Sequence, residues 1–114
     1  MSFRQLFILL SMLAVCQVTV RAQYIGPDSL RKIISSAKED RVRIDAMNKL
    51  SFRYYQDLEI DSSRYWAEQA LSLSKSTSYN SGTGIAYINI GNLTAWSWKH
   101  LDAIKFYKKA ILEL

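Results

Sequence analysis

The feature that most constrains this chain is a similarity between two of its own segments, forty residues apart. A forty-residue shift pairs small residues with small ones and large apolar residues with large apolar ones. The pairs are Ala46 with Ala86, Met47 with Tyr87, Leu50 with Ile90, Ser51 with Gly91, Ser63 with Ala103, Trp66 with Phe106, Ala70 with Ala110 and Leu71 with Ile111. Such periods indicate repeat architectures, in which each unit buries its apolar face against the next.

Within each unit the apolar residues recur at helical spacing, as Ile44, Met47, Leu50 and Tyr54 do. Only 4 glycines and 1 proline are present, which favours helices over a turn-rich β-sandwich. We expect helices over 28–39 and 40–56, from 61 to a loop-like segment at 77–84, from there to about 98, and from 101 onward. The end of the loop-like segment, Gly82–Gly84, can also be read as the start of the fourth helix. The predicted N-caps are Asp28 or Ser29 for the first helix and Asp61–Ser62 for the third.

These residues resemble the tetratricopeptide repeat, in its long-period form. The second unit matches the family's pattern with Tyr87, Ile90, Gly91, Ala103, Tyr107 and Ala110, and the first with Met47, Leu50, Ser51, Tyr54, Ser63 and Ala70. Trp98 stands where many such repeats have Gly at the turn between helices, and Thr94 replaces a usual aromatic. The resemblance implies an all-α fold of antiparallel helical hairpins, stacked as a short right-handed α-solenoid. Repeat 1 would cover 40–80 and repeat 2 would cover 81–114, after a leader and capping helix at 23–39.

The N-terminal segment is predicted to be a signal peptide. Residues 6–16 (LFILLSMLAVC) form an apolar run preceded by Arg4. This run is shorter than the roughly 20 residues that span a bilayer, but it fits the core of a signal peptide, usually about 7–15 residues. The small residue Ala22 predicts cleavage after it, so residues 1–22 would direct export to the periplasm or cell envelope. Alternatively, Leu13–Cys16 resembles a lipoprotein box, in which Cys16 would carry a lipid anchor.

The charge balance argues against nucleic acid as a partner. The whole chain has 15 basic and 10 acidic side chains, and removal of Arg4 and Arg21 with the signal peptide leaves 13 basic ones, a net charge of +3. Nucleic-acid binding usually needs a clustered basic stripe, whereas this excess is spread along the chain. The one basic cluster, Lys105, Lys108 and Lys109, has helical spacing and is predicted to be a solvated helix face.

The content of reactive side chains argues against an enzyme. The predicted mature chain has one histidine, His100, and no cysteine, which excludes a zinc cluster and a thiol nucleophile. Asp57, Glu59 and Asp61 lack the Gly and distal Glu of a calcium loop. We therefore expect no catalytic residues, no metal and no cofactor, and a protein or peptide partner.

The family resemblance also implies where that partner binds. In this family the first helix of each repeat lines a concave groove that holds an extended peptide or a partner helix. Carried over to this sequence, the groove positions are Asp45, Asn48, Lys49, Phe52, Tyr55, Ile88, Asn89, Asn92 and Trp96. Asn side chains would bond the partner's backbone, and aromatic side chains would supply contact area. Asp45 also precedes Lys49 by four residues, the order that favours a surface ion pair.

The last helix carries an apolar end, with Ala110, Ile111, Leu112 and Leu114, and no polar capping helix follows it in this sequence. We therefore expect either a longer repeat array or self-association through this helix. The order of signal peptide, leading helix and long-period repeats resembles the exported sensor segments of bacterial signalling proteins. The leading hypothesis is an exported interaction module at the front of a periplasmic sensor domain. The alternative is a lipid-anchored, repeat-containing component of a carbohydrate or nutrient uptake system, which requires acylation of Cys16.

Overall fold

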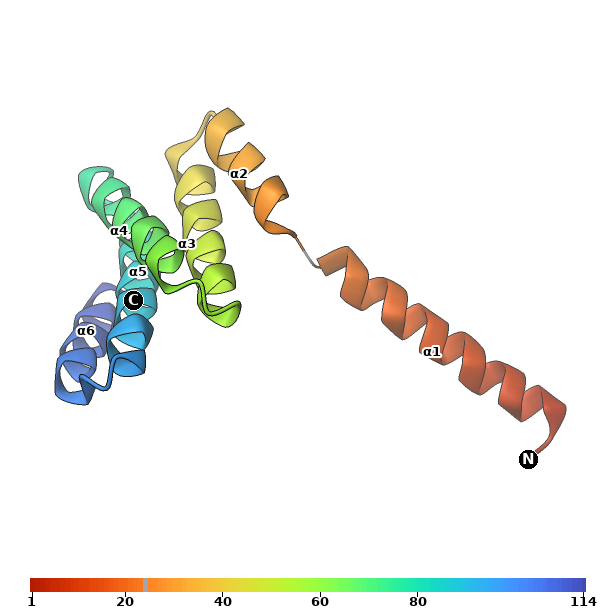
Figure 1. The fold of residues 1–114 in the computed structure, drawn as a ribbon. Helices are drawn as coiled ribbons and strands as arrows, with labels where there is room; N and C mark the ends of the chain where they lie inside the picture. The colour runs from red at the N-terminus through yellow and green to blue at the C-terminus, as the bar shows by residue number, and fades with distance from the viewer. Residues whose placement is uncertain (24) are drawn as a thin grey trace.

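A computed structural model of the protein is all-helical (Figure 1). It describes the backbone of residues 1–23 and 25–114 and the side chains of residues 1–13 and 25–114. The helices are α1 (Phe3–Gln23), α2 (Pro27–Ser36), α3 (Asp40–Gln56), α4 (Ile60–Ser76), α5 (Asn80–Trp96) and α6 (His100–Glu113). The described residues contain no strand, so the predicted all-α class is confirmed.

Helices α2 to α6 pack against one another in chain order. Each helix contacts the next, and α3 additionally contacts α5 across the intervening α4. The α3–α5 contact joins the first helices of the two segments that the forty-residue similarity relates. Because α3 and α5 touch directly, the surface between them is continuous, and a site can be built from both.

Helix α1 extends away from the other helices in Figure 1 and makes no contact with them within the described residues. Its described side chains are exposed, including Phe3, Phe7 and Met12. The search for helices that are both long and apolar enough to cross a membrane found none among the described residues. The predicted cleavage after Ala22 and acylation of Cys16 concern side chains outside the described ones.

The helices repeat with a period of twenty residues. Helices α3, α4, α5 and α6 begin at residues 40, 60, 80 and 100, and three-residue turns separate them. In each turn one residue has a positive φ: 60° at Leu58, 55° at Ser78 and 63° at Trp98. The same two backbone bonds close each turn; at the first, Leu58 N–H donates to Tyr55 O (3.1 Å) and Glu59 N–H donates to Tyr54 O (2.9 Å). This is the Schellman pattern, here built without glycine.

Because a side chain is strained at positive φ, Ser78→Gly should stabilise the protein by about 0.5–1 kcal/mol. The same change two residues earlier, Ser76→Gly, lies inside α4 and should destabilise by about 0.5 kcal/mol, since glycine is a poor helix former. Urea unfolding followed by circular dichroism measures both values. A change in the free energy of unfolding that has the same sign in both variants would contradict this turn geometry.

Several helix boundaries differ from the sequence prediction, including the end of α2, which is Ser36 and not residue 39. Helix α2 begins at Pro27 with Gly26 as N-cap, and α4 begins at Ile60 with Glu59 as N-cap, and neither N-cap makes a side-chain bond. The predicted caps Asp28, Ser29 and Asp61–Ser62 are therefore wrong, because each observed N-cap lies two or three residues earlier in the chain. Helix α5 begins at Asn80, so residues 80–84 of the 77–84 segment are helical, in agreement with the alternative that Gly82–Gly84 start the helix.

The glycines that suggested this loop are instead places of close helix approach. A Cβ on Gly82 would lie 2.6 Å from Ile44 Cγ2 on α3, and one on Gly84 would lie 2.6 Å from Leu114 Cγ. A Cβ on Gly91 would lie 2.6 Å from the Tyr107 ring on α6. Side chains at these positions would force the helices apart, which explains glycine inside a helix despite its low propensity.

Gly91→Ala should therefore destabilise the protein by about 1–2 kcal/mol, because the Tyr107 ring cannot move aside freely. The Tyr107 hydroxyl donates a 2.7 Å bond to Asn92 Oδ1, which holds the ring in place. The matched control is Gly84→Ala, where the obstructing Leu114 side chain is 68% exposed and can turn into solvent. The Ala110 carbonyl oxygen would still lie 3.3 Å from the added Cβ, so Gly84→Ala should destabilise by less than Gly91→Ala, by about 0.5 kcal/mol or less. Thermal unfolding of both variants distinguishes these two expectations.

The core lies in the seams between successive helices. One buried cluster joins α2 to α3 through Leu30, Ala46, Leu50 and Tyr54, and a second joins α3, α4 and α5 through Met47, Ala70 and Ala86. Small residues lie where the helices approach most closely: Ser51 Oγ donates to Ser63 O (2.8 Å), and Ser63 Oγ donates to Ser51 O (2.7 Å). Their counterparts forty residues later, Gly91 and Ala103, are likewise buried.

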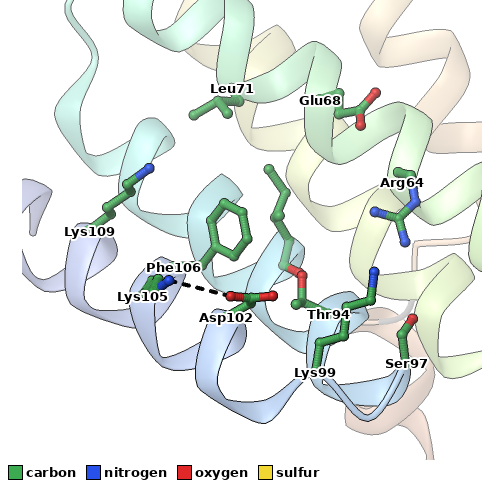
Figure 2. Close-up of a pocket in the computed structure, with 11 residues that line it drawn as sticks. Arg64, Glu68, Leu71, Thr94, Ser97, Lys99, Asp102, Lys105, Phe106 and Lys109 are labelled. Atoms are coloured by element: carbon green, nitrogen blue, oxygen red, sulfur yellow. Dashed lines mark hydrogen bonds and ion pairs between the residues drawn. The ribbon is translucent and has the colours of Figure 1, made fainter.

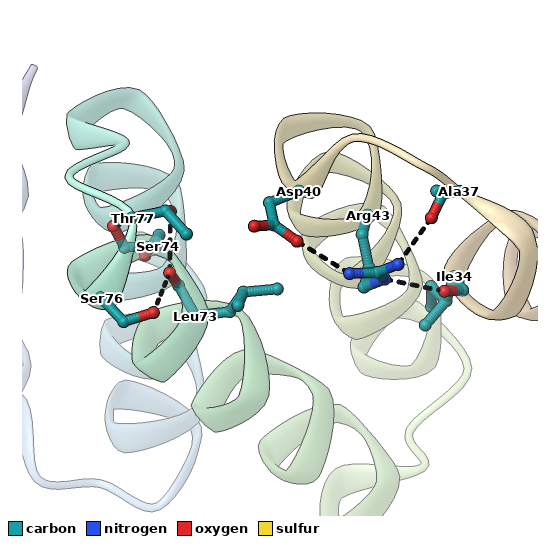
Figure 3. A network of polar contacts seen from close by, with 8 residues as sticks. All are labelled: Ile34, Ala37, Asp40, Arg43, Leu73, Ser74, Ser76 and Thr77. Carbon is teal, nitrogen blue, oxygen red and sulfur yellow. Dashed lines mark hydrogen bonds and ion pairs between the residues drawn. The ribbon is translucent and has the colours of Figure 1, made fainter.

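An arginine on α3, Arg43, connects α2 to α3 through hydrogen bonds (Figure 3). Arg43 Nε donates to Ile34 O (3.1 Å) and Nη2 donates to Ala37 O (2.6 Å), so the guanidinium binds two carbonyls at the end of α2. Arg43 Nη1 also pairs with Asp40 Oδ1 at 2.8 Å. Carbonyl groups at the end of a helix have no hydrogen-bond donor within the helix, and Arg43 provides the donors for two of them. Figure 3 also shows the end of α4, where Ser76 and Thr77 hydroxyls both donate to Leu73 O at 2.8 Å.

Candidate functional site

A groove of about 500 Å³ lies between α3 and the first half of α5. We call it the α3–α5 groove. Its lining residues are Asp45, Asn48, Lys49, Phe52, Tyr79, Ser81, Ile85 and Asn89. Five of the nine predicted groove positions are therefore brought together here, namely Asp45, Asn48, Lys49, Phe52 and Asn89.

Two buried asparagines form the floor of the groove. Asn48 Nδ2 donates to Gly82 O on α5 (3.1 Å), and Asn89 Nδ2 donates back to Asn48 O on α3 (3.1 Å). Both side chains are almost completely buried. Their amide donors thus serve the α3–α5 contact, where the sequence predicted bonds to a partner's backbone. They fix the spacing of the two helices that form the walls.

A tyrosine closes one end of the groove. Tyr79, in the turn before α5, donates a 2.9 Å hydrogen bond through its hydroxyl to Asp45 Oδ1 on α3. This bond to Asp45 raises the pKa of the Tyr79 hydroxyl, and burial adds to the effect. Arg41 lies over the Tyr79 ring at 5.1 Å. Within the described residues Asp45 forms no ion pair with Lys49, so the predicted pair is wrong: Asp45 turns to Tyr79 instead.

The open part of the groove combines apolar surface with one free cation. Phe52 is 45% exposed on α3 and Ile85 is 37% exposed on α5. The Lys49 side chain forms no hydrogen bond or ion pair within the part of the chain that the structure describes. Phe52 stacks on Tyr55, with ring centroids 6.4 Å apart. The arrangement offers two apolar contacts beside a positive charge, over a rigid polar floor.

The remaining predicted positions lie outside this groove. Tyr55 is half-buried beside Phe52, and Ile88 is also half-buried. Asn92 accepts the hydrogen bond from Tyr107, which commits its carbonyl to α6. Trp96 is exposed at the α5–α6 turn, near Trp98 and His100.

Three lining residues were missed by the sequence reasoning: Tyr79, Ser81 and Ile85. All three fall in or next to the segment expected to be a loop. Ile85 lies forty residues after Asp45, so the repeat period itself contained the signal that could have placed it in the groove.

The residues that line the α3–α5 groove include no histidine and no cysteine. Among the described side chains, those of residues 1–13 and 25–114, no group of three or more His, Cys, Asp or Glu is placed to hold a metal ion. His100 is exposed and makes an edge contact with the Trp98 ring at 5.9 Å. Asp57 pairs with Arg53 at 3.4 Å. Comparison with family models, curated proteins and solved structures found no match to this chain.

Proposed function

We propose that this chain is a protein-interaction module of the tetratricopeptide kind, with the α3–α5 groove as its partner-binding surface. The single observation that carries the proposal is the groove itself, formed by equivalent helices of two units and floored by the Asn48–Asn89 bonds. The twenty-residue helix period and the three like turns support a short α-solenoid. A rigid groove costs little entropy on binding, which favours recognition of a flexible segment.

The partner class follows from the groove's exposed groups. Phe52 and Ile85 offer apolar contact area, and Lys49 favours a nearby negative charge. The expected partner is therefore a peptide segment with an apolar anchor followed or preceded by an acidic residue. Aromatic and apolar anchors in such grooves usually contribute most of the binding energy.

We further propose that residues 1–22 are a signal peptide and that the module works in the periplasm or cell envelope. The support is that α1 makes no contact with α2–α6 within the described residues, so its removal would leave the core intact. We include in this proposal that the module forms the front of a periplasmic sensor domain. The alternative of a lipid-anchored uptake component requires acylation at Cys16, and metabolic lipid labelling lost in Cys16→Ser would favour it.

The groove is tested by selecting peptides from a displayed random library against the full chain and measuring their affinities by fluorescence anisotropy. Phe52→Ala should lower the affinity about tenfold or more, because it removes an exposed apolar anchor. Lys49→Glu should lower the affinity of acidic peptides several-fold.

The matched control is Arg64→Glu, which makes the same kind of charge reversal on α4, outside the α3–α5 groove. This variant should keep the wild-type affinity. Peptides that bind Phe52→Ala and Lys49→Glu as tightly as the wild type would reject the groove as the binding surface.

Self-association through α6 stays a prediction. Ile111 is 73% exposed, whereas its counterpart Leu71 is half-buried against the α3–α5 seam. Sedimentation velocity over a range of concentrations should show a rising sedimentation coefficient if this face pairs with a second copy.

A further inference from the structure

A second groove, of about 610 Å³, lies between α4 and α6 and shares no lining residue with the α3–α5 groove (Figure 2). We call it the α4–α6 groove. Helices α4 and α6 do not contact each other within the described residues, so side chains of α5 form its base. Its volume falls within the range of small-molecule sites, roughly 300–1,000 Å³.

The middle of the α4–α6 groove is apolar. Leu71 comes from α4, Ile90 from α5 and Phe106 from α6, so each of the three helices contributes one large apolar side chain. Figure 2 shows the Phe106 ring pointing into the space between the helices. This surface suits an aliphatic or aromatic body about the size of one ring.

Cations lie at both ends of this apolar middle. Arg64 of α4 and Lys99 of the α5–α6 turn line one end, where Figure 2 shows them together. At the other end Lys109 of α6 lies 5.5 Å from the Phe106 ring centre and 5.7 Å from that of Tyr87. Lys75 of α4 approaches the same Tyr87 ring, at 5.4 Å. Lys75 does not line the groove, so Lys109 is the lining cation at this end, and Arg64 and Lys99 are those at the other.

These charges are not all neutralised by the protein itself. Asp102 pairs with Lys105 at 3.5 Å. Within the described part of the chain, the side chains of Arg64 and Lys99 form no hydrogen bond or ion pair. The lining thus has four cations, Arg64, Lys99, Lys105 and Lys109, against two anions, Glu68 and Asp102, and one of the cations, Lys105, is paired with Asp102.

We propose that the α4–α6 groove binds a small organic anion with an apolar body and a carboxylate at each end. The carboxylates would pair with Arg64 and Lys99 at one end and with Lys109 at the other, while the body lies on Phe106 and Ile90. This site is independent of the partner-binding groove, because the two have no residue in common. The module would then sense a metabolite on one face and hold a peptide on the other.

Three probes with the same aromatic body test the proposal on the full chain: phenylene dipropionate, phenylpropionate and phenylpropanol, with two, one and no carboxylates. Amide shifts in an NMR titration give the dissociation constants and the site. The dipropionate should bind with a dissociation constant of about 1 mM. Affinity should fall about threefold with each carboxylate removed, because partly exposed ion pairs are weak.

Lys99→Glu and Lys109→Glu should each lower the affinity for the dipropionate about fivefold. Lys49→Glu, in the other groove, should leave it unchanged, and circular dichroism checks that each variant is folded. Equal affinity for all three probes would overturn the proposal, as would unchanged affinity in both lysine variants. Absence of shifts around Phe106 and Ile90 at several millimolar probe would overturn it as well.

Discussion

Leu50→Ala is expected to lower the free energy of unfolding by about 2–5 kcal/mol. Leu50 is fully buried, in the cluster that joins α2 to α3 and that Ile33, Ile34 and Trp66 cover from outside. Removing its side chain loses the transfer free energy of three carbons and leaves a cavity between helices that cannot close fully. For a domain of this size, the melting temperature should fall by about 10 °C or more.

The control for this variant is Leu101→Ala, the same chemical change on the exposed start of α6. It should change the stability by less than about 0.5 kcal/mol. Urea unfolding of both variants measures the difference. A loss below 1 kcal/mol for Leu50→Ala would mean that α2 does not cover this position, contrary to the packing described above.

Arg43→Met is expected to lower the free energy of unfolding by about 2–3 kcal/mol, because hydrogen bonds from a charged group contribute more to stability than neutral ones. The substitution keeps much of the side-chain length but leaves the carbonyls of Ile34 and Ala37 without their donor. Arg43→Lys should recover only part of the loss, since one ammonium cannot reproduce the planar fork that reaches two carbonyls. The effect should be greatest in α2, whose backbone amides should exchange with deuterium faster.

The matched control is Arg64→Met, because Arg64 forms no hydrogen bond within the described residues. The free energy of unfolding of this variant should lie within about 0.5 kcal/mol of that of the wild type. If amide exchange became faster evenly over α2–α6, and not mainly in α2, Arg43 would not be the residue that holds α2 against α3.

Helix α3 shows what could be predicted from sequence. Its range of 40–56 follows from an unbroken apolar stripe that includes Ile44, Met47 and Leu50. The forty-residue similarity likewise predicted that Ala70 and Ala110 are both buried, as they are. Local periodicity was sufficient in these cases because burial of a helix face depends on residues three and four positions apart.

The start of α5 could not be predicted in the same way. Gly82 and Gly84 lower helix propensity, so the local pattern is compatible both with a loop and with the start of a helix. Glycine occurs at these two positions because Ile44 packs against Gly82 and Leu114 packs against Gly84, and both of these residues are distant in sequence. The sequence left the start of α5 open, and Tyr79, Ser81 and Ile85, which lie in or next to that segment, were not predicted to line the groove.

Asn48 and Asn89 illustrate a second limit of sequence reasoning. Both line the α3–α5 groove, and their amides bond across to the other helix's backbone, at separations of 34 and 41 residues. Nothing in the neighbouring residues distinguishes an asparagine that serves such a contact from one that is free to bind a partner.

Intermolecular nuclear Overhauser effects between the full chain and a selected peptide test the central claim most directly. The peptide's apolar anchor should show contacts to the Phe52 ring and the Ile85 methyl groups, from both walls at once. Contacts only to Leu71, Phe106 or Ile111 would place the partner on another face and contradict the proposed use of the seam between α3 and α5.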